Sequence, residues 1–204
     1  MAASLALVLG LTLVVLCGSA AWAHHRPEPA GGTGGLAIPA LTHGEMAVVA
    51  RHASTIRALA DAQQRTDPTF RRLANFAALQ RTYCLWGVMP GSLADEASPF
   101  NACLHSYLAA LRALLTHMGE MPDGERARLL ASRIAAEMVA SAAAWDLCRN
   151  SAERFSTADV IVPEWRDVLG HPPSMLAFAG VAVLAAAGVW AVSGSGRRAS
   201  PPPA

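Results

Sequence analysis

The sequence contains no lysine, few aromatic residues and little charge of either sign. Its sixteen positively charged side chains are therefore all arginine, a bias that is typical of a high-GC bacterial genome. All fifteen acidic residues and all but two arginines lie between His24 and Pro173, so this part of the chain is nearly neutral. A nucleic-acid partner requires a basic face, and this charge balance indicates none, so we expect no nucleic acid as a partner.

The sequence also lacks the common motifs of redox and cofactor chemistry. It has no C-x-x-C motif, which a thioredoxin-like protein needs, and no C-x-x-C-H motif for covalent haem attachment. A Glu-x-x-His pair is missing as well, and with it the di-iron motif of helical bundles. We therefore expect no cofactor of these classes and a protein that is not an enzyme.

An apolar segment at the N-terminus has the pattern of an export signal. The stretch from Leu5 to Leu16 is almost continuously apolar, and Ala21-Trp22-Ala23 follows it as a small–x–small cleavage site. We therefore predict that residues 1–23 are a signal peptide. In a bacterium, this export places the bulk of the mature chain in the periplasm.

A second apolar segment, near the C-terminus, predicts a transmembrane helix. Residues 174–194 carry no charge, and at 1.5 Å per residue they span about 30 Å, the thickness of the hydrocarbon core. Arg197 and Arg198 follow closely, so the positive-inside rule predicts a cytoplasmic tail over residues 195–204. The sequence thus predicts a single-pass protein of the bacterial inner membrane.

The predicted span is rich in small residues. Gly180 and Gly188, together with alanines one turn apart such as Ala182 and Ala186, would let a second helix approach closely. Alanine is abundant along the whole chain, so composition alone is the alternative explanation. Association of transmembrane helices is therefore one candidate mode of interaction.

The exported region has the pattern of helices joined by short loops. Residues 24–40 are rich in Gly and Pro, and we expect them to form a flexible linker. A capping box over Thr42–Glu45 and the pair Asp67-Pro68 mark two helix starts. Apolar residues at helical spacing predict four helices, over about residues 43–64, 68–86, 99–119 and 123–150.

These patterns predict an all-α protein. We expect an up-and-down four-helix bundle outside the cytoplasm over residues 41–155, followed by one C-terminal transmembrane helix. Residues 156–173 form a juxtamembrane segment, in which Trp165 is expected at the level of the lipid headgroups. Only residues 160–162 have the alternation of a strand.

Three cysteines remain after the predicted removal of the signal peptide. In an oxidising compartment, three cysteines predict one disulfide and one free thiol. Cys84 near the end of the second predicted helix and Cys103 near the start of the third meet at one end of a bundle, so we favour this pair. Cys103 with Cys148 is the alternative, because the fourth helix returns Cys148 to the same end.

Two groups of histidine and methionine are candidate metal ligands. Cleavage of the signal would expose His24 and His25 at a new amino terminus, and an amine beside an imidazole chelates copper. His117, Met118 and Met121 combine an imidazole with two thioethers, which are soft ligands for Cu(I). This second group is similar to the short His/Met clusters of periplasmic copper carriers, over five residues only. The alternative is that Met118 ends an apolar stripe and His117 lies at a helix C-terminus.

The other histidines suit neither a helical metal pair nor catalysis. His43 and His52 are nine residues apart on one predicted helix and therefore lie on opposite faces. His105 lies near Cys103, but a Cys–His nucleophile needs a free thiol. A disulfide at Cys103 would remove that thiol.

One predicted loop is unusually apolar. It either forms a contact surface or folds over the end of the bundle as a cap. Its apolar side chains are Trp86, Val88, Met89 and Leu93.

The anchor, the small-residue span and the missing catalytic motifs together favour an accessory role. We expect a non-catalytic, membrane-anchored periplasmic accessory or assembly subunit of a bacterial inner-membrane complex. Its partners would be other inner-membrane or periplasmic proteins. The alternative is a periplasmic module that binds copper or a small ligand.

Overall fold

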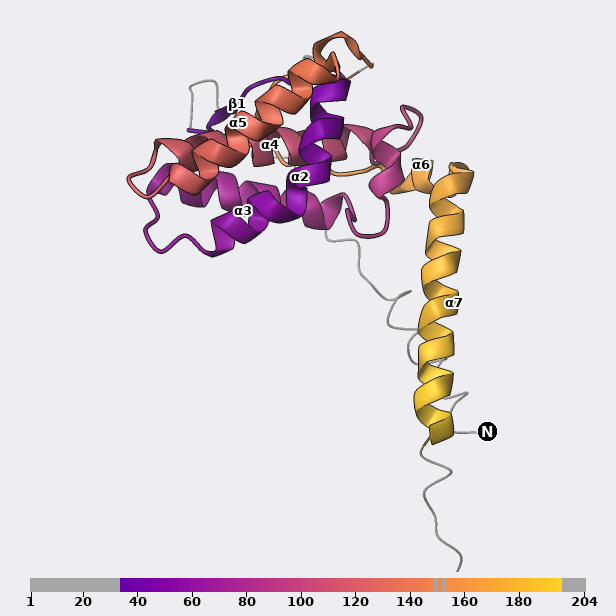
Figure 1. Ribbon diagram of the computed structural model, residues 1–204. Coiled ribbons are helices and arrows are strands. Elements are labelled where there is room, and N and C mark those ends of the chain that lie inside the picture. The colour runs from indigo at the N-terminus through magenta and orange to yellow at the C-terminus, as the bar shows by residue number, and fades with distance from the viewer. Residues whose placement is uncertain (1–33, 149, 152, 196–204) are drawn as a thin grey trace, which may run out of the picture. The chain divides into compact units, whose positions relative to one another are not determined.

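The computed structural model describes residues 34–148, 150–151 and 153–195, and these residues belong to one compact unit that begins at Gly34 (Figure 1). The predicted signal peptide, His24, His25 and the arginine pair of the tail lie outside the described residues. The described helices are α2 (His43–Asp61), α3 (Pro68–Tyr83), α4 (Asn101–Glu120), α5 (Glu125–Ala140), α6 (Trp165–Gly170) and α7 (Pro172–Ser195). Two short 3-10 helices, η1 (Pro90–Leu93) and η2 (Ala143–Trp145), and two strands, β1 (Ala37–Ile38) and β2 (Phe155–Ser156), complete this part of the chain.

Two of the predicted helix starts are confirmed. Thr42 caps α2, because its hydroxyl accepts a hydrogen bond from Glu45 N–H at 3.2 Å and the Glu45 carboxylate accepts one from Thr42 N–H at 2.8 Å. Asp67 caps α3, where its Oδ1 accepts a hydrogen bond from Phe70 N–H at 2.7 Å and Pro68 opens the first turn. These side chains satisfy N–H groups that have no partner inside their own helix.

Helix α4 is the central element of the helical domain. It packs against α2, α3 and α5, and every residue from Cys103 to Leu111 is buried. A helix of an up-and-down bundle keeps one face in solvent, whereas this stretch of α4 keeps none. The prediction of a mostly helical chain is confirmed, and the up-and-down bundle stays a prediction.

The end of α5 differs from its prediction. The helix ends at Ala140 rather than near Asn150, and Ala142 adopts a left-handed backbone with φ of 51°. The Ser141 hydroxyl donates to the Glu137 carbonyl oxygen at 2.8 Å and so competes for the last turn. The chain turns away at this point, and Trp145, which lies within the predicted range of this helix but beyond its observed end, is 85% exposed.

Two short strands bring distant parts of the chain together. β1 and β2 are antiparallel, with Ile38 opposite Phe155, and both of these side chains are buried. Regular structure therefore begins inside the segment 24–40 that was expected to be a flexible linker, because Ile38 joins the core. Residues 160–162, which have the alternation of a strand, form none.

A disulfide joins Cys84, at the C-terminal end of α3, to Cys103, in the first turn of α4. This is the pairing that the sequence favours over Cys103 with Cys148. Cys148 is the free cysteine among the described residues.

The apolar loop between α3 and α4 folds over the end of the core. Met89 and Leu93 are buried, and Val88 packs against the core from a partly buried position. The Trp86 ring lies against the Tyr107 ring, with centroids 5.3 Å apart. Of the two alternatives for this loop, the geometry favours a cap.

Helix α7 is long and apolar enough to cross a membrane by its length and composition, and it is the one such helix among the described residues. The candidate span covers Pro172–Ser193, and none of its most apolar window is buried inside the protein. The short helix α6 precedes it, with Val168 buried and Trp165 half-exposed, edge-on to Phe100. These features are consistent with a single-pass membrane protein.

Candidate metal centre

Two histidines and the free cysteine converge where α2, α4 and the segment after α5 meet. His43 begins α2, His105 lies in the second turn of α4, and Cys148 follows η2. One ligand atom from each residue can be chosen so that all three lie within 4.8 Å of one another. His105 is fully buried, and His43 and Cys148 are partly buried.

Hydrogen bonds hold the Cys148 segment against the start of α2. The Ser151 hydroxyl accepts hydrogen bonds from His43 N–H at 3.1 Å and from Cys148 N–H at 2.8 Å. The same hydroxyl donates to Cys148 Sγ at 3.4 Å. Ser151 therefore positions both His43 and the cysteine.

Two further contacts come from the residues on either side of His43. The Thr42 hydroxyl donates to the Ala143 carbonyl oxygen at 2.8 Å, and Gly44 N–H donates to the Asp146 carbonyl oxygen at 3.1 Å. A Cβ on Gly44 would lie 2.5 Å from the Ala143 oxygen, so only glycine permits this approach. The first turn of α2 is thus built to receive the segment that carries Cys148.

A side-chain contact ties the same segment to α4. The Asn150 amide donates to Asn101 Oδ1 at 2.7 Å. Asn101 in turn donates to the carbonyl oxygens of Ser92, Leu93 and Asp95. The site is therefore braced from the loop before α4 as well as from α2.

The electrostatics keep His105 neutral. Burial, followed by the neighbouring His43, lowers the pKa of His105 from 6.5 to about 4. A neutral imidazole offers a lone pair to a metal ion, which a protonated ring does not. His105 is therefore ready to bind a metal at neutral pH without first losing a proton.

The group has the donor chemistry of a metal site. Cys148 Sγ lies 3.9 Å from His105 Nε2 and 4.0 Å from Nδ1, and the two histidine rings have centroids 5.7 Å apart. Thiolate and imidazole are the ligands that zinc and copper prefer. This His/His/Cys group could hold such an ion.

The residues of the predicted His/Met group make other contacts in the structure, and their role as metal ligands stays a prediction. His117 Nε2 lies 2.8 Å from Asp67 Oδ2, so this imidazole pairs with the residue that caps α3. Met118 is buried in the core, and the Met121 sulfur accepts a hydrogen bond from Gln63 at 3.8 Å. These positions agree with the alternative interpretation, in which Met118 belongs to an apolar stripe and His117 lies at a helix C-terminus.

The sequence gives no sign that His43, His105 and Cys148 lie together, because no two of them show a metal-ligand spacing. His43 was compared with His52, which instead lies 2.7 Å from Glu137 and links α2 to α5. His105 was paired with Cys103, which the disulfide occupies. Cys148 was the usable signal, because an odd cysteine beside a disulfide indicates a free reactive thiol.

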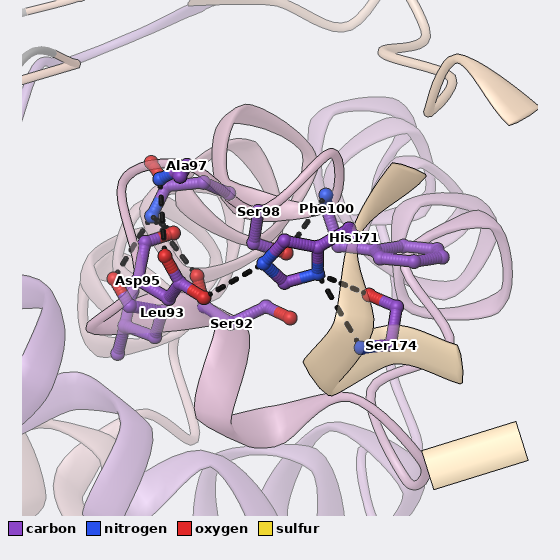
Figure 2. Close-up of polar contacts among 9 residues, drawn as sticks. Ser92, Leu93, Asp95, Ala97, Ser98, Phe100, His171 and Ser174 are labelled. Carbon is purple, nitrogen blue, oxygen red and sulfur yellow. Dashed lines mark hydrogen bonds and ion pairs between the residues drawn. The ribbon is translucent and has the colours of Figure 1, made fainter. Parts of the chain in front are cut away.

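A second polar cluster lies where α6 meets α7. Figure 2 shows the His171 ring between Asp95 and Ser174, with Nε2 at 2.9 Å from Asp95 Oδ2 and Nδ1 at 2.8 Å from the Ser174 hydroxyl. Asp95 also accepts a hydrogen bond from Ala97 N–H at 3.1 Å. The chain of contacts therefore runs from the loop before α4 to the first turn of α7.

The order Ser–His–Asp is that of a hydrolase triad, but this cluster does not offer a nucleophile. Ser174 is 1% exposed, so its hydroxyl does not reach a substrate. Ser174 N–H also approaches His171 Nδ1 at 3.4 Å, which is the arrangement of a side-chain cap at a helix start. We assign His171 the role of a joint between the helical domain and α7.

The remaining predicted contact residues differ in exposure. Trp165 is half-exposed, and a Cβ on Gly180 or Gly188 would meet nothing within 4 Å. Each of these three positions has open space beside it. The capping loop, by contrast, turns most of its apolar surface inward.

No known protein family, curated protein or solved structure matches this chain. Its class follows from the fold, a mostly helical protein with one helix apolar enough to span a membrane. Its function has to be derived from its own residues.

Proposed function

We propose that this protein is a non-catalytic, membrane-anchored accessory or assembly subunit of a bacterial inner-membrane complex. The observation that carries the proposal is α7, a helix whose apolar surface is not covered by the rest of the protein. Lipid or another transmembrane helix is the favourable environment for such a surface. Gly180 and Gly188 leave room for a close neighbour along it.

The proposed topology follows from both ends of the chain. The apolar N-terminal segment acts as a cleaved export signal, and Arg197 and Arg198 hold the tail in the cytoplasm. The helical domain, which we take to be a variant of an up-and-down four-helix bundle, then lies in the periplasm. The Cys84–Cys103 disulfide supports this placement, because disulfides persist in oxidising compartments.

The joint at His171 supports a role that depends on distance from the membrane. His171 connects Asp95 of the helical domain to the first turn of α7. No long linker separates the domain from the span, so a partner must also lie close to the membrane. Trp145, exposed on the segment after α5, is the candidate contact residue of the domain.

The test is the native mass of the protein extracted from its own membrane in mild detergent. We expect a species heavier than the chain alone that contains other membrane or periplasmic proteins. Trp145→Ala should reduce the amount of these proteins, whereas the exposed control Arg133→Ala should not. A lone or purely self-associated chain would overturn the proposal.

The second candidate function is a metal-binding module, and the group His43, His105 and Cys148 favours it. This role is compatible with an assembly subunit, because a metal site can serve the complex to which the subunit is attached. The test is the metal content of the protein purified without chelators. We expect about one transition-metal ion per chain in the wild type and none in Cys148→Ser; equal contents in both would contradict this role.

A further inference from the structure

We propose that His43, His105 and Cys148 bind a single copper(I) ion as its three ligands. The inference rests on the second proposed function, that this group holds a metal, and it names the ion.

The number of ligands favours copper(I). The group contains three His, Cys, Asp or Glu residues, and the described part of the chain adds no fourth residue of these types to it. Structural zinc sites are almost always closed by four protein ligands. Cu(I) is selected by soft thiolate ligands, and imidazole also suits copper.

The spacing of sulfur and nitrogen is close to that of a metal site. With metal bonds of about 2.3 Å to sulfur and about 2.0 Å to nitrogen, a tetrahedral angle places these atoms about 3.5 Å apart, and a trigonal angle about 3.7 Å. Cys148 Sγ lies 3.9 Å from His105 Nε2, slightly longer than either value, and the three ligand atoms all lie within 4.8 Å of one another. Small movements of the side chains would bring the atoms to bonding distance.

The charge of the occupied site also favours a monovalent ion. A thiolate and Cu(I) cancel, so two neutral imidazoles and these two charges leave the site neutral. A divalent zinc ion would leave one positive charge against the fully buried His105, and a buried unpaired charge is costly. Glu96 is the acidic group that acts on His105, and it is exposed to solvent.

The balance of the binding step is simple. The Cys148 thiol exchanges its proton for the copper–sulfur bond, and the proton passes to solvent through the partly exposed side of the site. Each imidazole binds through a nitrogen lone pair, so no bond is broken in either ring. One proton therefore leaves for each ion bound, and no electron is transferred.

His43 provides an independent indication of a ligand. Its Nδ1 is buried and has no hydrogen-bond partner among the described residues. A buried polar nitrogen without a partner destabilises the fold. A metal bond at the His43 ring, or a hydrogen bond that the ring makes once the ion fixes its orientation, would remove this cost.

The experiment is an anaerobic titration of the full chain in mild detergent, after removal of metals, with Cu(I) in competition with a coloured Cu(I) chelator. We expect one Cu(I) per chain and a thiolate-to-copper absorption band in the ultraviolet. Cys148→Ser should abolish the band and weaken binding by more than about 100-fold, because loss of an outer partner alone costs about 10–100-fold. His43→Ala should weaken binding with the disulfide and helix content unchanged.

Matched controls separate the failure of this inference from the failure of the metal-binding function. His117→Ala and Met121→Leu, which alter the other His/Met group, should leave the affinity and the band unchanged. Tighter binding of Zn²⁺ than of Cu(I), lost in Cys148→Ser, would overturn the copper assignment and leave the metal-binding function standing. No binding of either ion by the folded wild type would overturn both.

Discussion

Helices α4 and α7 are similar in length but have opposite relations to the rest of the protein. α4 carries Asn101, His105 and Tyr107 into the interior, where protein covers it on nearly all sides. α7 is more apolar, yet its most apolar window is not buried inside the protein. Apolar composition alone therefore does not identify a core helix. The described structure surrounds α4 with protein, and it leaves the apolar surface of α7 uncovered, as a membrane helix requires.

The strongest test of this difference is a matched pair of leucines. Leu108 in α4 is 0% exposed and Leu184 in α7 is 73% exposed. Leu108→Ala should lower the free energy of unfolding of the helical domain by about 2–5 kcal/mol, because it leaves a cavity. Leu184→Ala should change it by no more than about 0.5 kcal/mol. Urea unfolding in mild detergent measures both, and equal effects would contradict the contrast between the two helices.

A charge in α7 tests whether lipid surrounds that helix. Leu184→Arg near the middle of the span should raise the free energy of membrane insertion by about 2.5–3.5 kcal/mol. Leu129→Arg, on an exposed site of α5, is the control and should not alter insertion. The measurement is the fraction of chains that resist alkaline extraction from membranes. An unchanged fraction for Leu184→Arg would mean that α7 does not cross the bilayer.

Removal of the His171 side chain should loosen the attachment of α7 to the helical domain without unfolding either of them. His171→Ala deletes the contacts to Asp95 and Ser174 and should change the global free energy of unfolding by less than about 1 kcal/mol. Local opening near residue 171 should become more frequent, so limited proteolysis there should be faster. Arg166→Ala, an exposed neighbour, is the control. Cleavage at the wild-type rate would show that the joint does not hold this segment.

Low pH should loosen the surroundings of α4 by a small amount. The hydrogen bond from Phe70 N–H lowers the pKa of Asp67 below 3.8, burial opposes this shift, and His117 on α4 adds to it. A carboxyl group with a lowered folded pKa stabilises the fold above its unfolded pKa, and this contribution is lost as pH falls through the folded pKa. Asp67→Asn keeps a good N-cap and should flatten the loss of stability below pH 4. An identical acid transition in both proteins would contradict the role of Asp67.

Local signals account for what could be predicted from the sequence. The Thr42 and Asp67 caps, the stripe of α4 and the uninterrupted apolar run of α7 depend on neighbours within a few residues. The end of α5 could not be read in this way. Its apolar spacing continues past Ala140, but the helix ends there. The end coincides with the left-handed turn at Ala142 and with the hydrogen bond from the Thr42 hydroxyl, at the start of α2, to the Ala143 carbonyl oxygen.

The candidate site is a product of the tertiary fold. His43, His105 and Cys148 lie on three separate segments, and none of them shows a ligand spacing with another. Their approach depends on Gly44, which allows close contact with Ala143, and on Ser151, which bonds to two of the three segments. The sequence indicates an unpaired cysteine but not its neighbours.

The disulfide also determines which sulfur remains free for chemistry. Of the three cysteines that the structure describes, Cys84 and Cys103 are bonded to each other, and Cys148 alone is a free thiol. The same bond fixes the first turn of α4, only two residues before His105. The disulfide must therefore be in place if Cys148 is to be the single sulfur ligand of the proposed metal site. With this bond reduced, Cys84, Cys103 and Cys148 would compete for a soft metal, and with it formed only Cys148 among them would be available.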